Sequence, residues 1–109
     1  MDDCSDELKL LTILSTVKVL LERVSEENDW SFESAQESLN VINDAIAFYF
    51  EPIKYEFPNK LSMQFTPTGP LQEISISNGW DKAYLKLAKQ FDKYSYCLKR
   101  KKPYNPQIN

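Results

Sequence analysis

Residues 61–80 read LSMQFTPTGPLQEISISNGW, and the pattern in this stretch decides the fold that the sequence predicts. Leu61, Met63 and Phe65 alternate with polar residues, as Ile74 and Ile76 do further on. Alternation with a period of two is typical of a half-buried β-strand, and the prolines and glycine between the two runs are typical of a turn. We therefore expect a β-hairpin, packed on helices because two strands alone are only marginally stable in water.

A first helix is predicted over about residues 6–25, where apolar side chains recur at steps of three and four residues and so share one side. These side chains are Leu10, Ile13, Leu14, Val17, Leu20, Leu21 and Val24. Leu8, Leu11 and Val19 fall on the opposite side of this helix. Either the helix is covered on both sides, which we favour, or these three side chains belong to a subunit interface.

A second helix is predicted to begin at Ser31, or at Ser34 with Glu37 as a capping box, and to reach Phe50. Its apolar face comprises Phe32, Ala35, Leu39, Ile42, Ala45, Ile46, Tyr49 and Phe50. Pro52 ends the helix because proline has no N–H to donate and clashes with the preceding turn.

A third helix follows the hairpin. Asp81 is expected to cap it, with Trp80 packed on Leu85 as a hydrophobic staple. Residues 103–109 carry no periodicity and are expected to form a C-terminal tail. The predicted architecture is a single α+β domain over residues 1–102, in the order α-α-β-β-α: two N-terminal helices, a β-hairpin and a C-terminal helix.

The composition excludes several classes of reaction. The 109-residue chain has no histidine, which excludes a histidine general base, a histidine-dependent nucleophile and any zinc site built on imidazole. Its two glycines, Gly69 and Gly79, are too far apart to build a phosphate-binding loop. We therefore predict a protein that is not an enzyme and uses no metal or other cofactor.

Cysteine usage and hydropathy indicate the compartment. Cys4 and Cys97 lie near opposite ends of the chain, without CxxC spacing, so reduced thiols are expected, with a disulfide between them as the alternative. No apolar run approaches the ~18 to 20 residues that a membrane span requires, and the first residues are acidic where a secretory signal would be basic. The expected location is the cytoplasm, away from membranes.

The charged residues are segregated along the chain. Residues 1–56 carry 13 acidic and 4 basic side chains, whereas residues 57–109 carry 3 acidic and 9 basic ones, although the net charge is only −3. Like charges four residues apart on a helix are mutually destabilising, so the segregation calls for a reason beyond solubility. One reason is recognition, because a surface of a single sign steers an oppositely charged partner.

Two charged faces are candidate binding sites. The acidic face comprises Glu26, Glu27, Asp29, Trp30, Glu33, Glu37 and Asp44, and the basic face comprises Lys82, Lys86, Lys89 and Lys93. Our leading hypothesis is that the acidic face binds a basic protein, such as a nucleic-acid-cleaving toxin, with Trp30 as the anchor. The alternatives are a nucleic-acid-binding regulator that uses the lysines and the run 99–102, and head-to-tail self-association between the faces.

The sequence around Gly79-Trp80 resembles one helix-turn-helix of the AraC-type regulators, in which an aromatic residue follows the turn glycine. It departs from that pattern at three positions. Ser75 replaces the small apolar residue at the contact between the helices, Asn78 replaces the apolar residue before the glycine, and Lys89 replaces the aromatic residue that closes the recognition helix. The alternation that precedes the glycine also fits a strand better than a first helix.

A second resemblance rests on the segment FTPTGPLQEIS at residues 65–75 and on Asn78-Gly79-Trp80 after it. This segment is similar to one in a family of small bacterial proteins that have the size and organisation of immunity proteins, which neutralise the toxins of competing bacteria. The resemblance implies binding to another protein without catalysis. It transfers no functional residue.

Overall fold

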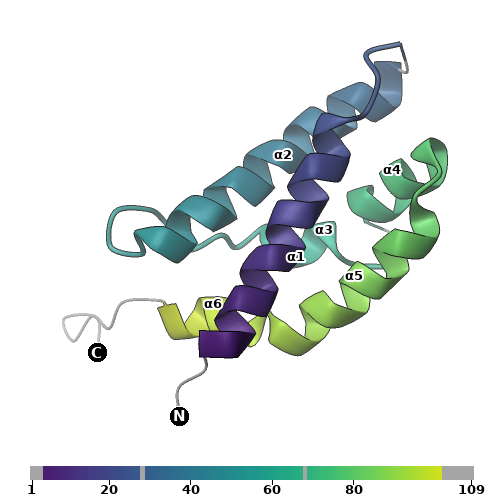
Figure 1. The fold of residues 1–109 in the computed structure, drawn as a ribbon. Helices are drawn as coiled ribbons and strands as arrows, with labels where there is room; N and C mark the ends of the chain where they lie inside the picture. Colours follow the sequence, from purple (N-terminus) through teal and green to yellow (C-terminus); the bar gives the residue numbers. More distant parts are fainter. Residues whose placement is uncertain (1–3, 28, 68, 102–109) are drawn as a thin grey trace.

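The computed structural model describes residues 4–27, 29–67 and 69–101, and every regular element within them is a helix (Figure 1). The elements are α1 (Cys4–Glu22), α2 (Asp29–Phe50), α3 (Leu61–Gln64), α4 (Pro70–Asn78), α5 (Asp81–Tyr94) and α6 (Tyr96–Lys101). Helix α1 packs against both α2 and α5, which lie on either side of it, and α4 contacts α2 and α5. The short helices α3 and α6 pack on α2 and α1.

The predicted β-hairpin, and with it the α+β class, is wrong: over the described residues the stretch forms α3, a turn and α4, and no strand. Leu71, Ile74 and Ser75 are buried at steps of three and four residues, which is the period of a helix. Ile76, whose alternation with Ile74 suggested a strand, is 58% exposed. The fold is all-α.

The two ends of α4 explain why these residues form a helix. Pro70 is its first residue, where the missing N–H costs no helical hydrogen bond. Gly79 follows the last residue with φ +81°, a left-handed conformation that glycine adopts without strain. The N–H of Trp80 donates to the Ser75 carbonyl at 3.0 Å and that of Gly79 to Ile76 at 3.4 Å, which is the Schellman pattern of a helix C-terminus.

The turn before α4 requires glycine at position 69, because other parts of the chain approach its backbone closely there. A Cβ at Gly69 would lie 2.5 Å from Thr66 Oγ1 and 2.6 Å from the Met63 carbonyl oxygen. The Thr66 hydroxyl donates to that carbonyl at 3.0 Å, so the turn is already closed by its own hydrogen bond. This turn sets the angle between α3 and α4.

The first two predicted helices are confirmed as α1 and α2, with small differences in their bounds and in which residues are buried. Helix α2 begins at Asp29, so Ser31 lies inside its first turn and is fully buried. Phe50 is 63% exposed, and Phe48 fills the core in its place. The outer face of α1 is only partly covered within the described residues: Leu11 packs against the core, whereas Leu8 and Val19 remain exposed. The core is also not purely apolar, since it includes three buried serines, Ser31, Ser38 and Ser75.

The third predicted helix is present but divided. Helix α5 ends at Tyr94, and α6 begins after Ser95. The predicted staple is wrong: Leu85 is 51% exposed, and Trp80 instead packs edge-on against Tyr84, with ring centroids 6.4 Å apart. Asp81 is the first residue of α5 rather than its cap, and Trp80 makes no capping hydrogen bond through its side chain.

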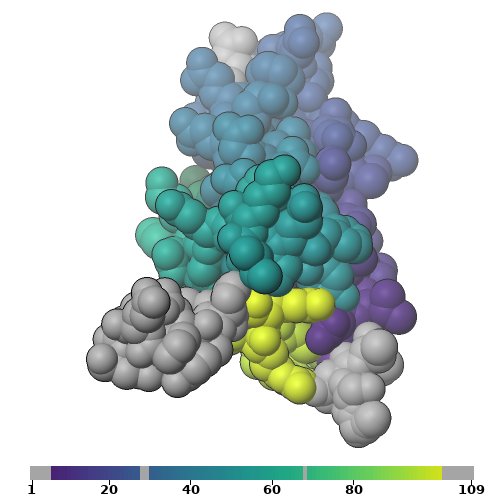
Figure 2. Space-filling view, turned by 90° about the vertical axis from the view of Figure 1, so that its left-hand side faces the viewer, coloured from purple at the N-terminus to yellow at the C-terminus, as the bar shows by residue number. Residues whose placement is uncertain are grey.

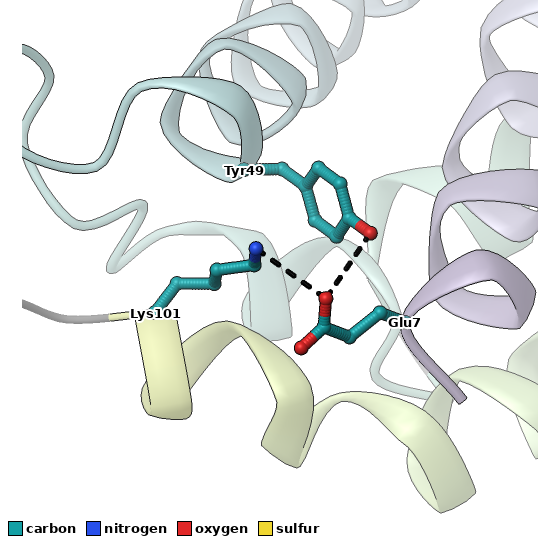
Figure 3. A network of polar contacts seen from close by, with 3 residues as sticks. All are labelled: Glu7, Tyr49 and Lys101. Atoms are coloured by element: carbon teal, nitrogen blue, oxygen red, sulfur yellow. Dashed lines mark hydrogen bonds and ion pairs between the residues drawn. The ribbon is translucent and has the colours of Figure 1, made fainter. Parts of the chain in front are cut away.

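Polar contacts join helix α6 to the beginning of α1. The Lys101 ammonium lies 3.3 Å from a Glu7 carboxylate oxygen, to which the Tyr49 hydroxyl donates at 3.4 Å (Figure 3). The Tyr96 hydroxyl donates to Asp6 at 2.6 Å, and this bond raises the pKa of the Tyr96 phenol. These contacts bring two segments more than 80 residues apart in the chain into one assembly.

The predictions for the thiols and the tail are only partly covered by the structure. Cys97 is buried and free, and burial is the main cause that raises the pKa of its thiol. The side chain of Cys4 and the predicted tail 103–109 lie outside the described residues. The predicted domain boundary at residue 102 therefore stays a prediction.

Candidate acidic docking face

The acidic side chains predicted to bind a partner lie on the outer face of α2 and in the loop before it. Glu33, Glu37 and Asp44 are exposed, and their spacing on the helix places them within about 40° of one another. Glu26 and Glu27 are exposed in the preceding loop. Asp29 begins α2, but its side chain lies outside the described part of the structure. On the side of the molecule that Figure 2 shows, α2 and the segment after it form the upper and central surface, with α1 beside them and α6 below.

Trp30 lies at the beginning of the same face. Its side chain is 48% exposed, so it combines a solvent-facing ring with partial packing on the helix. Tryptophan is over-represented among the residues that dominate binding energies at protein interfaces. The predicted anchor is therefore accessible to a partner.

A pocket opens at the opposite end of the acidic face. It has a volume of about 420 Å³, and Asp44 forms part of its lining together with Val41 from the same helix. The segment after α2 folds back over the helix and supplies the other wall, which includes Tyr55, Glu56 and Lys60. Two carboxylates, one ammonium and an aromatic ring thus line the same pocket.

Sequence reasoning did not identify Tyr55 and Glu56. They lie in an irregular segment between α2 and α3 with no periodic pattern, so nothing in the sequence predicts that this segment returns to α2. The Tyr55 ring already accepts a cation, since the Lys54 ammonium lies 5.4 Å from its centroid. The pocket therefore has the chemistry to receive a lysine or arginine side chain.

The basic face lies on α5, on the other side of α1 from α2 (Figure 1). Lys82, Lys86, Lys89 and Lys93 are all exposed along one side of this helix. In the described part of the chain, no ion pair joins these lysines to the α2 carboxylates; the ion pair that the structure shows is between Glu7 and Lys101. The two faces therefore do not neutralise each other within one molecule.

Helices α4 and α5 form a helix-turn-helix around Gly79. Two polar residues that depart from the AraC-type pattern are accommodated by hydrogen bonds. The buried Ser75 hydroxyl donates to the Gln72 carbonyl at 2.7 Å, and the Asn78 amide donates to the Ser31 hydroxyl at 2.6 Å. The objection that this segment fits a strand is removed by the structure.

Two further features of the described residues concern metal binding and membranes. Over residues 4–27, 29–67 and 69–101, no group of three or more acidic or cysteine side chains is placed to hold a metal ion. No helix in these ranges combines the length and the apolar character needed to span a bilayer.

Comparisons of the chain with protein-family models, with curated proteins and with solved structures return no match.

Proposed function

We propose that this protein is a non-catalytic binding module of the immunity type, acting in the cytoplasm, whose acidic face on α2 docks on a basic protein such as a toxin. The observation that carries the proposal is the pocket that Asp44, Glu56 and Tyr55 line, in which the two carboxylates outnumber the one ammonium, that of Lys60. It lies at one end of an exposed acidic stripe and provides a defined receptor for one cationic side chain of the partner.

Apart from Lys60 in the pocket, no cation of the described residues lies against the acidic face, and this supports the role. Carboxylates that are paired within the molecule would have to lose those pairs before they could bind a partner. Glu33 and Glu37 make no such pair with any residue that the structure describes, so their attraction for a basic surface is available to a partner. Such attraction acts mainly on the association rate, which it can raise by ~10- to 1000-fold.

The pocket contributes to the specificity of partner binding rather than to the association rate. A cationic group that enters it is partly removed from water, where its interaction with Asp44 and Glu56 is stronger than at an open surface. Arginine fits this chemistry best, because its planar guanidinium pairs with carboxylates in a forked geometry and stacks on aromatic rings. Trp30, 14 residues before Asp44 on the same helix and so about 21 Å away along its axis, supplies a second, apolar contact.

The test begins with cross-linking of the protein to its bound partner, followed by measurement of the Kd for the purified pair. We expect a basic partner whose affinity falls at least 10-fold for Asp44→Asn with Glu56→Gln. The matched control is Lys86→Gln with Lys89→Gln, which changes the same number of charges on the basic face and leaves the affinity within about twofold. A partner whose affinity depends on the lysines and not on the carboxylates would contradict the proposal.

A second candidate function is nucleic-acid binding through α4 and α5. It is favoured by one observation, the helix-turn-helix around Gly79, which presents the four lysines of α5 to solvent. This candidate predicts that the protein binds duplex DNA and that the affinity falls steeply as the salt concentration rises. It also predicts that this dependence on salt becomes weaker in the Lys86→Gln, Lys89→Gln variant. Both results together would support DNA binding against the acidic-face proposal.

A further inference from the structure

A groove lies between α5, the end of α3 and the turn that precedes α4. Its volume is about 360 Å³. Three aromatic rings line it: Phe65 stacks on Phe91 with centroids 3.9 Å apart and lies 6.2 Å from the Tyr84 ring. Leu85 and Ala88 of α5 complete an apolar wall, so the groove is a surface on which an apolar molecule would lose contact with water.

One of the residues that line the groove, Tyr84, carries a hydroxyl that has no partner among the described residues. Tyr84 is 1% exposed, and its hydroxyl is buried and makes no hydrogen bond to any described residue. Most buried polar side-chain atoms in proteins do find a partner, because leaving one unpaired is costly. A bound molecule with an acceptor atom would remove that cost.

The charges at the groove restrict what kind of acceptor fits. Lys89 and Asp92 both line it, one of each sign, so the groove has no net preference for an ion. Burial, and then the charge of Asp92, raise the pKa of Tyr84 to about 12, so the phenol is a neutral donor at pH 7. An anionic acceptor next to this hydroxyl would be repelled by the Asp92 carboxylate.

We propose that the groove binds a neutral, mainly apolar small molecule whose carbonyl oxygen accepts a hydrogen bond from the Tyr84 hydroxyl. The volume accommodates a molecule with one ring and a short substituent. The hydroxyl is buried in this structure, so a ligand reaches it only when the side chains that cover it move. This site shares no residue with the acidic face and does not depend on the function proposed for it.

The test uses two probes of similar shape, acetophenone and ethylbenzene, of which only the first carries a carbonyl. NMR titration of the intact protein should show shifts of the Leu85 and Ala88 methyl signals with both probes, whereas the methyl signals of Leu8, exposed on α1, stay constant. Tyr84→Phe removes the donor alone and should weaken acetophenone binding about 5- to 10-fold, the effect of one hydrogen bond. Ethylbenzene should bind the variant and the wild type equally.

A second variant keeps the proposal testable if Tyr84→Phe fails to fold. Ala88→Leu leaves the hydroxyl in place but fills the groove, and should abolish the binding of both probes without changing the circular dichroism spectrum. The proposal is overturned if acetophenone does not shift the groove methyl signals, or if it binds Tyr84→Phe as well as the wild type. Tighter binding of benzoate than of acetophenone would overturn the choice of a neutral ligand.

Discussion

The side-chain amide of Asn78 donates a 2.6 Å hydrogen bond to the hydroxyl of Ser31, which lies 47 residues earlier in the chain. The same amide donates to the Ile74 carbonyl at 2.9 Å. Asn78 thus ends α4 and joins it to the first turn of α2, where Ser31 is fully buried. This bond fixes the helix-turn-helix against the helix that carries the acidic face.

Replacement of Asn78 with alanine should therefore destabilise the protein. The variant loses two hydrogen bonds at a partly buried contact, and we expect the free energy of unfolding to fall by about 1–3 kcal/mol. Urea denaturation followed by circular dichroism measures this change. Asn40→Ala, at an exposed position of α2, is the matched control and should change stability by less than about 0.5 kcal/mol. An equal effect of the two variants would mean that the bond to Ser31 does not support the fold.

The end of α4 gives a prediction about the backbone alone. Gly79 has φ +81°, and a Cβ there would meet no atom within 4 Å, so Gly79→Ala tests conformation without any clash. Alanine in the left-handed region costs about 1–2 kcal/mol, partly offset by the lower entropy of its unfolded chain. Thermal unfolding should show a lower Tm for Gly79→Ala and a smaller decrease for Gly79→Asn, because asparagine tolerates this region better. A Tm for Gly79→Ala equal to that of the wild type would contradict the Schellman ending.

The helix α4 shows how far the sequence predicts this fold. Helices α1, α2 and α5 were predictable because long runs of apolar residues follow the period of a helix. In α4 only nine residues are available, and Ile74 and Ile76 imitate the period of a strand. The signal that could have identified the helix is the pair of residues at its ends, Pro70 at the first position and Gly79 after the last.

The candidate site was predictable in part for a related reason. The acidic stripe on α2 follows from helical spacing alone, and its side chains are exposed. The pocket depends on Tyr55 and Glu56, whose position is set by how an irregular segment folds back after Pro52. Buried polar residues were missed as well: Ser75 lies in the core because its hydroxyl is satisfied by a carbonyl within its own helix, which no hydrophobicity pattern reveals.

The contact between Lys101 and Glu7 should make a small contribution to stability. The ammonium also lies 4.6 Å from the centre of the Tyr49 ring, so Lys101→Met removes an ion pair and a cation–π contact together. Both partners are about a quarter exposed, and we expect a loss of about 0.5–1 kcal/mol that decreases at high salt. Lys99→Met, at an exposed position of the same helix, is the control and should leave the unfolding midpoint unchanged. No difference between the two variants at low salt would show that α6 is held by its buried Cys97 and Leu98 and by the Tyr96–Asp6 bond, without help from Lys101.

The Tyr84 hydroxyl gives a prediction at high pH. Its pKa is about 12 in the folded protein against 10.0 in an unfolded chain, so the unfolded state loses the proton first as the pH rises. The stability that this group contributes is fully present below pH 10 and is lost between pH 10 and 12, by up to about 1.4 kcal/mol per pH unit. In Tyr84→Phe this loss is absent, so the variant should gain stability relative to the wild type across that range. Urea denaturation at pH 9, 10 and 11 measures the difference, and a constant difference would contradict the burial of the hydroxyl.

The positions of the two charged faces lead to a prediction about self-association. Because α2 and α5 lie on opposite sides of α1, a second molecule could stack its basic face on the acidic face of the first, and such a contact would weaken with salt. If the acidic face instead serves a different protein, as we propose, the mass measured by light scattering should be the same at 20 mM and 500 mM salt. A higher mass at low salt, which returns to that of one chain in the Lys86→Gln, Lys89→Gln variant, would show that the two faces bind each other. In that case self-association would explain the charge segregation, and no outside partner would be needed.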